Sequence, residues 1–512
     1  MTCTAAAPTR AVGTVGPELA AADRWTDDAV AAAGIPLRDV PFVTVGGGIG
    51  SFVTVDCLRI AGVPRSGIAV LTNLDRPWRT YEYLTRVSQI PRGERIRSDS
   101  ASRPDNIWGF PSYALQEAVR ERTLAPLRQV LVEPLLADFY TPRLGAVLEG
   151  IEREARRIGY GDMVVRGEVR TVRRRVGGGY FSVLAPAAGT SPFRRVAVRS
   201  RDVHVAVGYP GLRFLPDLQR FRLEHGDFVH VVNAYEDHEH VYASLRRRPG
   251  TVLVRGGGIV ASRILDRLLR DREEDGLRTQ VVHVLRTYVD GSHGPHPWAR
   301  RAGGDGFAYQ GFNYPKSVWG GQHKARIRRL DGERRARAYA EMGGTSTPYR
   351  RGWQRQLSEG RRGGWYRAMA GTVEEMRPGG REPVHVTIRT DRGAVQLGVD
   401  FVIDCTGLEA DVTEHPLLAD LLRQGGAVRN PLGRLEVERT FELRGTASGD
   451  GRLYVSGAAA LGGYFPGVDT FLGLQIAAQE IAEDLARRGM CRRIGPVRSV
   501  AQWLKWTTDR RI

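Results

Sequence analysis

The chain has 512 residues, of which 42% are hydrophobic and 26% charged, the usual balance of a globular protein that folds in water. The length allows two or three domains, because a single hydrophobic core stops growing at roughly 250 to 300 residues. No apolar run approaches the about 18 to 20 residues that span a bilayer, and the N-terminus lacks the basic start and apolar block of a secretory signal. We therefore expect neither a membrane span nor secretion.

The chain has a formal net charge of +18, and a strongly positive net charge is typical of nucleic-acid-binding proteins. Only Lys316, Lys324 and Lys505 are lysines among the 75 basic residues, however, and alanine and glycine are abundant. GC-rich coding DNA favours arginine over lysine and favours alanine and glycine, so this composition arises without selection for binding a partner. We therefore expect no nucleic-acid partner. The densest basic segment, residues 324–367, is either a solvated face or a surface for an anionic substrate, a cofactor phosphate or an acidic partner.

The four cysteines, Cys3, Cys57, Cys405 and Cys491, are too far apart in sequence for a CxxC or metal-ligand motif. This spacing predicts a cytoplasmic, reducing location and no metal site. It also argues against the flavoproteins that reduce disulfides through a closely spaced cysteine pair.

Residues 1–40 are rich in alanine, threonine and proline and predict a flexible extension. A strand at Phe42–Val45 then runs into Gly46, Gly48 and Ser51, in the pattern Gly-x-Gly-x-x-small. The first glycine permits a tight turn, the second lets backbone approach a pyrophosphate, and the small third residue lets the following helix pack on the strand. A second strand at 67–71 completes a βαβ unit.

The stretch 72–111 is long, polar and aromatic, and contains Trp108, which we expect beside the cofactor. Apolar residues at helical spacing then predict helices at 114–120 and 144–158, and short strands follow between 163 and 198.

A second glycine turn follows the strand Val252–Val254 and contains Gly256, Gly258 and Ala261. Its own βαβ unit closes with the strand 280–285, after which Arg286 is placed to pair with a 2′-phosphate.

Strands at 202–210 and 400–408 each end in a turn of small residues, on either side of the second glycine turn. A last strand ends at Ser456 and Gly457, and a helix begins near Asp469 or Thr470, both good N-caps, and runs to about residue 488.

In this order, the motifs of residues 41–488 resemble the flavoproteins with two dinucleotide-binding domains, and within them the NADPH-dependent flavin monooxygenases, which include N-hydroxylating and Baeyer-Villiger enzymes. The resemblance implies an α/β fold with two Rossmann-like domains, the NADPH domain being inserted into the FAD domain through hinges at 205–210 and 404–408. It implies these segments: an FAD-binding domain at 41–210 and 401–512, an NADPH-binding domain at 211–400, and an arginine-rich insertion at 290–370.

The resemblance also implies the residues that bind the two cofactors. For FAD they are Gly46, Gly48, Gly50, Ser51, Asn73, Trp108, Gly457, Asp469 and Thr470, and for NADPH they are Gly256, Gly258, Ala261 and Arg286. Two positions depart from the family pattern. Thr72 and Asn73 stand where an acid usually binds the FAD ribose, with Asp75 slightly late, and Ala458 replaces the aspartate that usually follows Gly457.

Other polar clusters match no site. The segment 292–298 contains His293 and His296 but lacks the Phe-x-Gly of a Baeyer-Villiger fingerprint and a third zinc ligand, so we interpret it as a loop. The acidic, histidine-containing run 236–240 is typical of a solvated segment.

The resemblance thus implies an FAD- and NADPH-dependent monooxygenase that hydroxylates a small molecule with oxygen through a flavin hydroperoxide, as a tailoring or N-hydroxylating enzyme. The alternatives are a flavin oxidoreductase or dehydrogenase that inserts no oxygen, and a non-catalytic nucleotide-binding regulatory protein that docks through its arginine-rich insertion. The catalytic side chains, the substrate and the oligomeric state do not follow from the sequence.

Overall fold

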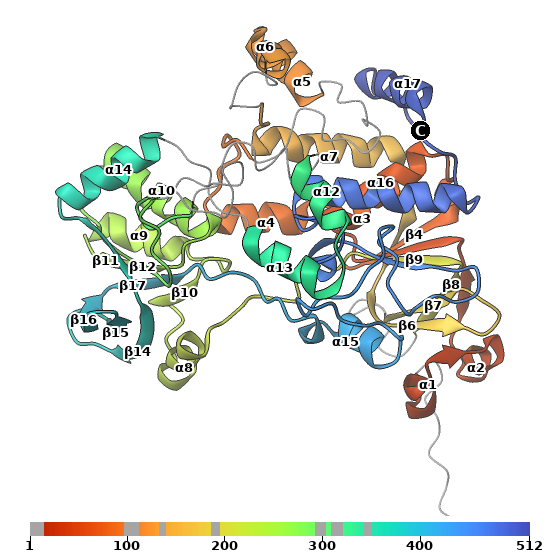
Figure 1. Cartoon of the computed structure of the whole chain (residues 1–512), viewed down its shortest axis with the longest axis horizontal. Coiled ribbons are helices and arrows are strands. Elements are labelled where there is room, and N and C mark those ends of the chain that lie inside the picture. The colour runs from red at the N-terminus through yellow and green to blue at the C-terminus, as the bar shows by residue number, and fades with distance from the viewer. Residues whose placement is uncertain are drawn as a thin grey trace, which may run out of the picture.

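The computed structural model describes residues 15–96, 112–132, 140–185, 195–291, 304–308, 321–342 and 351–512. Within these residues the strands form four sheets, two of them wholly parallel and flanked by helices (Figure 1). The protein is thus of the α/β class, as predicted. No helix in the described part of the chain is both long and apolar enough to cross a membrane.

The first parallel sheet has the strand order β18-β9-β3-β4-β5. Its strands are β3 (Phe42–Val45), β4 (Ile68–Thr72), β5 (Val164–Arg166), β9 (Asp202–Val205) and β18 (Leu453–Val455). The helices α3 (Ile49–Ile60), α7 (Leu144–Ile158) and α16 (Phe471–Arg487) lie along the sheet, and α16 packs on α3 (Figure 1). Because both faces of the sheet are covered, β3 and β4 are apolar almost throughout and fully buried.

The second parallel sheet has the order β10-β17-β11-β12-β13. Its strands are β10 (Val231–Asn233), β11 (Thr251–Arg255), β12 (Gln280–Leu285), β13 (Tyr366–Ala370) and β17 (Phe401–Asp404). Helices α9 (Glu239–Arg247), α10 (Ile259–Glu274) and α14 (Arg351–Arg362) accompany it. All five strands fall in sequence between β9 and β18, so the second domain is inserted into the first, as predicted. The predicted boundary at residue 400 is wrong, because β17 pairs with β10 and β11 inside the second sheet and not with the first.

The N-terminal segment departs from the flexible extension predicted for residues 1–40. Its described residues form α1 (Pro17–Ala21), β1 (Arg24–Trp25), α2 (Asp27–Ala32) and β2 (Leu37–Asp39). The two strands are the edges of a five-stranded sheet whose centre is β6 (Glu168–Arg175), β7 (Tyr180–Ala185) and β8 (Val196–Ser200).

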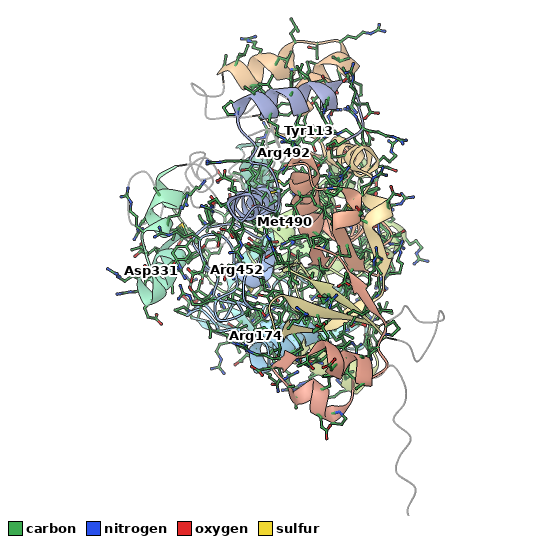
Figure 2. All side chains as sticks on the ribbon, turned by 90° about the vertical axis from the view of Figure 1, so that its right-hand side faces the viewer. Tyr113, Arg174, Asp331, Arg452, Met490 and Arg492 are labelled. Atoms are coloured by element: carbon green, nitrogen blue, oxygen red, sulfur yellow. The ribbon has the colours of Figure 1, made fainter. Side chains whose placement is uncertain are left out.

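Three contacts order this segment. Trp25 is buried against Phe181. Arg173 on β6 binds the Ala20 and Ala22 carbonyls at 2.9 Å. Arg174 pairs with Asp23 at 2.9 Å, beside the N-terminal helices (Figure 2). All three partners of the N-terminal segment lie more than a hundred residues away in sequence, which is why local composition did not reveal them.

The predicted insertion and the stretch after it also contain strands that the sequence did not indicate. Residues 366–370, at the end of the predicted insertion, are the edge strand β13 of the second sheet. They lead into an antiparallel sheet of β14 (Thr372–Pro378), β15 (Val384–Thr390) and β16 (Gly393–Val399).

The remaining α-helices of the described residues are not among those named above with the parallel sheets or the N-terminal segment. They are α4 (Arg79–Val87), α5 (Tyr113–Glu121), α6 (Ala125–Val132), α8 (Pro216–His225), α12 (Gln322–Arg328), α13 (Gly332–Met342), α15 (Pro416–Arg423) and α17 (Pro496–Thr507). Of these, α4 lies inside the stretch 72–111 that the sequence left without regular structure.

Candidate functional site

The first glycine turn joins β3 to α3 and has one glycine held by protein and one facing open space. Gly46 has φ +130°, and a Cβ there would lie 2.2 Å from the Ala206 carbonyl oxygen, so only glycine fits. Gly48 is the N-cap of α3, and a Cβ there would meet no atom within 4 Å. The start of this 12-residue helix therefore faces space that no described residue fills, and its first N–H groups have no partner within the helix, which suits a phosphate.

Gly50 and Ser51 lie beneath this turn. A Cβ on Gly50 would lie 3.1 Å from the Ala206 Cβ, so helix and strand approach closely here. Ser51 is buried, and its hydroxyl oxygen accepts the Gly47 backbone N–H at 3.1 Å. Gly50 thus allows the close packing of α3 under the turn, and Ser51 holds the turn through the hydrogen bond to Gly47.

The groups at the end of β4, beside this turn, are neutral. The Thr72 hydroxyl donates to the Gly46 carbonyl at 2.7 Å and accepts the Leu74 N–H at 3.0 Å. Asn73 is exposed just past the end of β4. Asp75, the nearest acid in sequence, pairs with Arg79 at 2.6 Å.

The C-terminal segment returns to the same end of the sheet. Ser456 Oγ would lie 3.4 Å from a Cβ on Gly50, and Gly457 adopts φ +77°. Thr470 caps α16 by accepting the Gly473 N–H at 3.1 Å. The structure thus brings Gly457 and the start of α16 to the first glycine turn. Trp108 lies outside the described residues.

Asp469 contacts a hinge residue. Its carboxylate accepts the Tyr209 hydroxyl at 2.7 Å, and burial together with this carboxylate raises the pKa of Tyr209. The two predicted hinges run side by side, because Leu212 and Leu408 form an antiparallel bridge and Glu409 N–H donates to Gly211 O at 2.9 Å.

The second glycine turn repeats the geometry of the first. Gly256 has φ +125°, and a Cβ there would lie 2.9 Å from the Cys405 carbonyl oxygen. Gly258 is the N-cap of α10, and a Cβ there would again meet nothing within 4 Å. Ala261 is fully buried, as close packing of helix on strand requires.

A cavity of about 610 Å³ opens beside this second turn. Arg286 lines it from the end of β12, is exposed, and forms no ion pair with another residue in the described part of the chain. Arg213 and Arg255 also line the cavity, and no sequence motif had marked them. Arg255 pairs with Asp217 at 2.6 Å, so the positive charge that suits dinucleotide phosphates comes from Arg213, Arg286 and the helix N-terminus.

A buried acid lies behind this cavity. Asp404, at the end of β17, is fully buried, and its Oδ2 accepts the Thr406 hydroxyl at 3.0 Å. Burial raises the pKa of Asp404 to about 6, although Arg255 opposes the shift. Asp404 Oδ1 has no hydrogen-bond partner among the residues that the structure describes.

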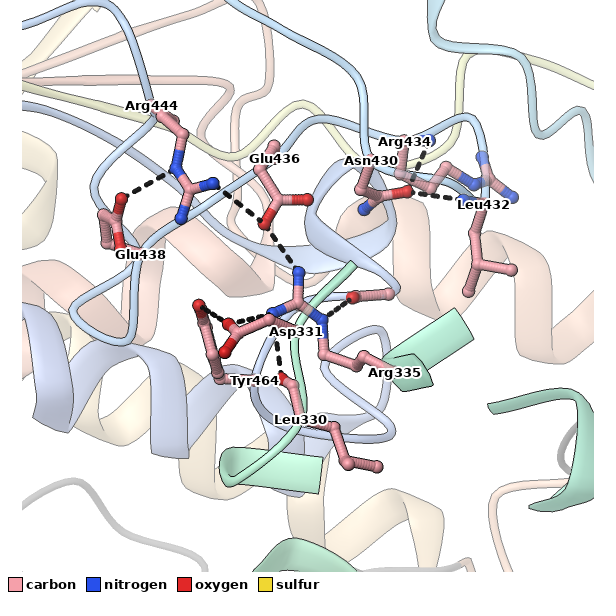
Figure 3. Close-up of polar contacts among 12 residues, drawn as sticks. Leu330, Asp331, Arg335, Asn430, Leu432, Arg434, Glu436, Glu438, Arg444 and Tyr464 are labelled. Carbon is pink, nitrogen blue, oxygen red and sulfur yellow. Dashed lines mark hydrogen bonds and ion pairs between the residues drawn. The ribbon is translucent and has the colours of Figure 1, made fainter. Parts of the chain in front are cut away.

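The arginine-rich insertion docks on the first domain through α13, whose Arg335 points toward Glu436 in Figure 3, and through α12, whose Arg328 lies 4.7 Å from the centre of the Phe465 ring. Arg335 is 1% exposed, pairs with Glu436 at 2.6 Å and donates to the Gly462 carbonyl at 2.7 Å. The Tyr339 hydroxyl contacts the Gly463 and Phe465 carbonyls, each at 2.9 Å. This face of the insertion is therefore an internal interface, and it adjoins the segment that leads to Asp469.

The other clusters considered from the sequence give no site. His238 is buried rather than solvated, with Nε2 3.1 Å from the Tyr242 hydroxyl, and Glu236 pairs with Arg222 at 2.8 Å. Residues 292–298 lie outside the described part. Across the described ranges, no group of three or more histidine, cysteine or acidic residues is placed to hold a metal.

Two parallel sheets, each with a glycine turn at a helix N-terminus and joined by paired hinges, make up the fold of flavoproteins with two dinucleotide-binding domains. No protein-family model matches the sequence, and a search of curated protein sequences found no match.

Solved structures do match. The ornithine N-hydroxylase of Kutzneria sp. 744, solved with reduced FAD, NADP⁺ and L-ornithine, is 15% identical, with a TM-score of 0.62 over 88% of this chain and 100% of that chain. L-lysine 6-monooxygenase from Pseudomonas syringae is 16% identical, with a TM-score of 0.60 over 88% and 99%. Bacillithiol disulfide reductase from Bacillus cereus is 13% identical, with a TM-score of 0.52 over 88% and 100%. At such identities the likeness concerns the fold, which monooxygenases share with a disulfide reductase.

Proposed function

We propose that this protein is an FAD- and NADPH-dependent monooxygenase that hydroxylates a small molecule. The observation that carries the proposal is the pair of matched glycine turns, in which Gly48 and Gly258 cap helices and face open space. The first turn would hold FAD and the second NADPH, because Arg286 stands beside the second turn only.

The cofactor pair supplies the redox chemistry, namely hydride transfer from the nicotinamide to the flavin and reaction of the reduced flavin with oxygen. The protein's part is to bind and orient. Backbone N–H groups at the starts of α3 and α10 receive the pyrophosphates, and Arg286 receives the 2′-phosphate. The insertion, anchored through Arg335, helps to exclude water near the start of α16.

Hydroxylation of a primary amine is the form of this function that we favour, because structural neighbours act on ornithine, lysine and cadaverine. The second candidate is an oxidoreductase that inserts no oxygen, which the shared fold of the disulfide reductase supports. We also propose a reducing, cytoplasmic location, because the four cysteines are too far apart in sequence for a CxxC motif.

The test begins with purified protein reconstituted with FAD. Retained flavin absorbance, oxidation of NADPH and matching oxygen uptake are expected. L-ornithine, L-lysine and cadaverine are then supplied in turn, and a hydroxylamine product is sought. Protein that neither retains FAD nor oxidises NADPH contradicts the whole proposal. NADPH oxidation coupled to another acceptor, without an oxygenated product, favours the second candidate.

A further inference from the structure

A row of four buried polar side chains crosses the first sheet beneath its glycine turn. Thr44 on β3 lies 3.0 Å from Ser51 on α3 and 3.0 Å from Nδ1 of His204 on β9. His204 Nε2 lies 2.8 Å from the hydroxyl of Ser456, which follows β18. The row thus joins one helix and three strands.

The donors and acceptors along this row are mutually consistent. Ser51 accepts from the Gly47 N–H and from the Thr44 hydroxyl. Thr44 therefore accepts from His204 Nδ1–H, which leaves Nε2 to accept the Ser456 hydroxyl. Complete burial lowers the pKa of His204 to about 3, so the imidazole is neutral and carries one proton. In this arrangement each contact between neighbours in the row has one donor and one acceptor.

The two ends of the row are parts of the first candidate site. One end is the backbone N–H of Gly47, between the two glycines of the turn, and the other is Ser456, directly before Gly457. These are the two segments that meet at the start of α3. The family pattern has carboxylates beside both segments, where this chain has Asn73 after β4 and Ala458 after Gly457.

The second sheet contains a corresponding histidine. His283 on β12 is fully buried, its Nε2 lies 2.6 Å from the Gly256 carbonyl oxygen, and its Nδ1 lies 2.9 Å from the Tyr366 hydroxyl. Burial lowers the pKa of His283 to about 4, so this imidazole is also neutral. The carbonyl cannot donate, so Nε2–H donates to Gly256 O and Nδ1 accepts from Tyr366.

Packing alone does not require these imidazoles. The neighbours of His204 along β9 are the buried residues Val203 and Val205, and those of His283 along β12 are Val282 and Val284. An apolar side chain would fill either position without a desolvation cost, whereas a buried polar row must be satisfied at every member and then fixes one geometry. A histidine beneath each glycine turn is therefore a positional constraint on that turn.

We propose that His204 and His283 are positioning residues, each of which holds one glycine turn in the shape that receives its dinucleotide. His204 fixes the Gly47 turn relative to the Ser456–Gly457 turn, and His283 fixes the Gly256 carbonyl. The assignment of FAD to the first turn and NADPH to the second rests on the proposed function.

The test is reciprocal. In His204→Phe, the FAD dissociation constant should rise about tenfold, the effect of losing one or two hydrogen bonds, while the KM for NADPH at saturating FAD stays within about twofold. In His283→Phe, the KM for NADPH should rise about tenfold while FAD affinity stays within about twofold. His204→Gln and His283→Gln, which retain donor and acceptor atoms, should recover part of each loss.

Thr44→Val and Ser456→Ala break single links of the row and keep the test open if His204→Phe does not fold. Each should weaken FAD binding and leave the KM for NADPH unchanged. Equal damage to both cofactors by either histidine variant, or no effect of the His204, Thr44 and Ser456 variants on FAD affinity, overturns the inference. Wild-type protein that binds no FAD overturns the proposed function instead. The effect of His283→Phe on NADPH binding is measured separately and does not depend on the effect of His204→Phe on FAD binding.

Discussion

The Thr72 hydroxyl donates a hydrogen bond to the carbonyl oxygen of Gly46 at 2.7 Å, so the last residue of β4 is tied to the glycine turn at the place where a ribose-binding carboxylate was expected. The next side chain, Asn73, is exposed. The first site therefore has neutral groups at the place where the flavoprotein family pattern has an acid.

Asn73→Glu should restore a carboxylate to this place and bind FAD about tenfold more tightly, because a hydrogen bond from a ribose hydroxyl to a charged acceptor is stronger than one to an amide. The measurement is the FAD dissociation constant of the deflavinated protein. Asn73→Gln, equal in length but uncharged, is the control. The expectation is wrong if both variants bind FAD equally well.

Gly48→Val should leave folding intact and abolish flavin binding. The backbone at Gly48 is extended (φ −79°, ψ −166°), and the added Cβ meets nothing within 4 Å in the protein. Its bulk then occupies only the space proposed for the pyrophosphate. Gly258→Val should do the same to NADPH binding at the second turn, where the backbone is equally extended (φ −88°, ψ −174°).

The control for these variants is Gly46→Val, which should lower the melting temperature, because its Cβ would lie 2.2 Å from the Ala206 carbonyl oxygen at φ +130°. Thermal unfolding separates this fold defect from the binding defects. A Gly48→Val protein that still retains stoichiometric FAD contradicts the proposed site.

The parts of the fold that could be predicted from sequence are those written in local patterns. The helix Leu144–Ile158 and the strand Gln280–Leu285 occur with the predicted bounds, and both glycine turns lie between a strand and a helix. Each of these depends on residues a few positions apart, where turn chemistry and apolar periodicity decide the outcome.

The parts that could not be predicted depend on distant partners. The strand at Arg24–Trp25 exists because it pairs with Arg174 and Arg175, about 150 residues later in sequence. Arg335 stands in an arginine-rich run, where its sequence does not distinguish it from its solvated neighbours. In the structure it is buried and hydrogen-bonded to Glu436 and to the Gly462 carbonyl. Neither partner is marked by a motif.

Arg286→Ala should raise the KM for NADPH about 10- to 100-fold and leave the KM for NADH within about twofold. The side chain lines the second cavity and has no acidic partner in the described part of the chain, so its charge is available for a 2′-phosphate, and a charge-assisted hydrogen bond is worth about 1.5 to 3 kcal/mol. Steady-state kinetics with both nucleotides gives the ratio. Equal losses for NADPH and NADH would refute this role of Arg286.

Asp404→Asn should stabilise the protein above pH 6. Because burial raises the pKa of Asp404 from 3.8 to about 6, the native state binds more protons than the unfolded state between these values, and wild-type stability falls as pH rises through them. The variant lacks this loss, so its advantage should reach at most about 3 kcal/mol at neutral pH and vanish below about pH 4.

Urea unfolding between pH 4 and pH 8 measures this difference. Asp411→Asn is the control of opposite sign, because hydrogen bonds from Thr413 hold the pKa of Asp411 below its usual value. Its carboxylate stabilises the native state as pH rises, so Asp411→Asn should lose stability relative to wild type at neutral pH. A pH-independent gain in Asp404→Asn would mean that the buried charge is not its cause.

Arg335→Met should detach the insertion from the first domain. The substitution roughly keeps the volume but removes the Glu436 partner at 2.6 Å and leaves this buried carboxylate only Arg444, at 3.9 Å. Removing one member of a buried pair costs about 3 to 5 kcal/mol, and Arg444 should reduce that cost. Protease cleavage within residues 321–342 should then accelerate. In Arg335→Met/Glu436→Leu both charges are gone, so most of the stability should return and cleavage should slow again.

If the single variant resists protease as well as wild type does, the pair does not anchor the insertion. If the double variant is cleaved as fast as the single one, the Arg335 bond to the Gly462 carbonyl is the anchor, and the ion pair with Glu436 is secondary.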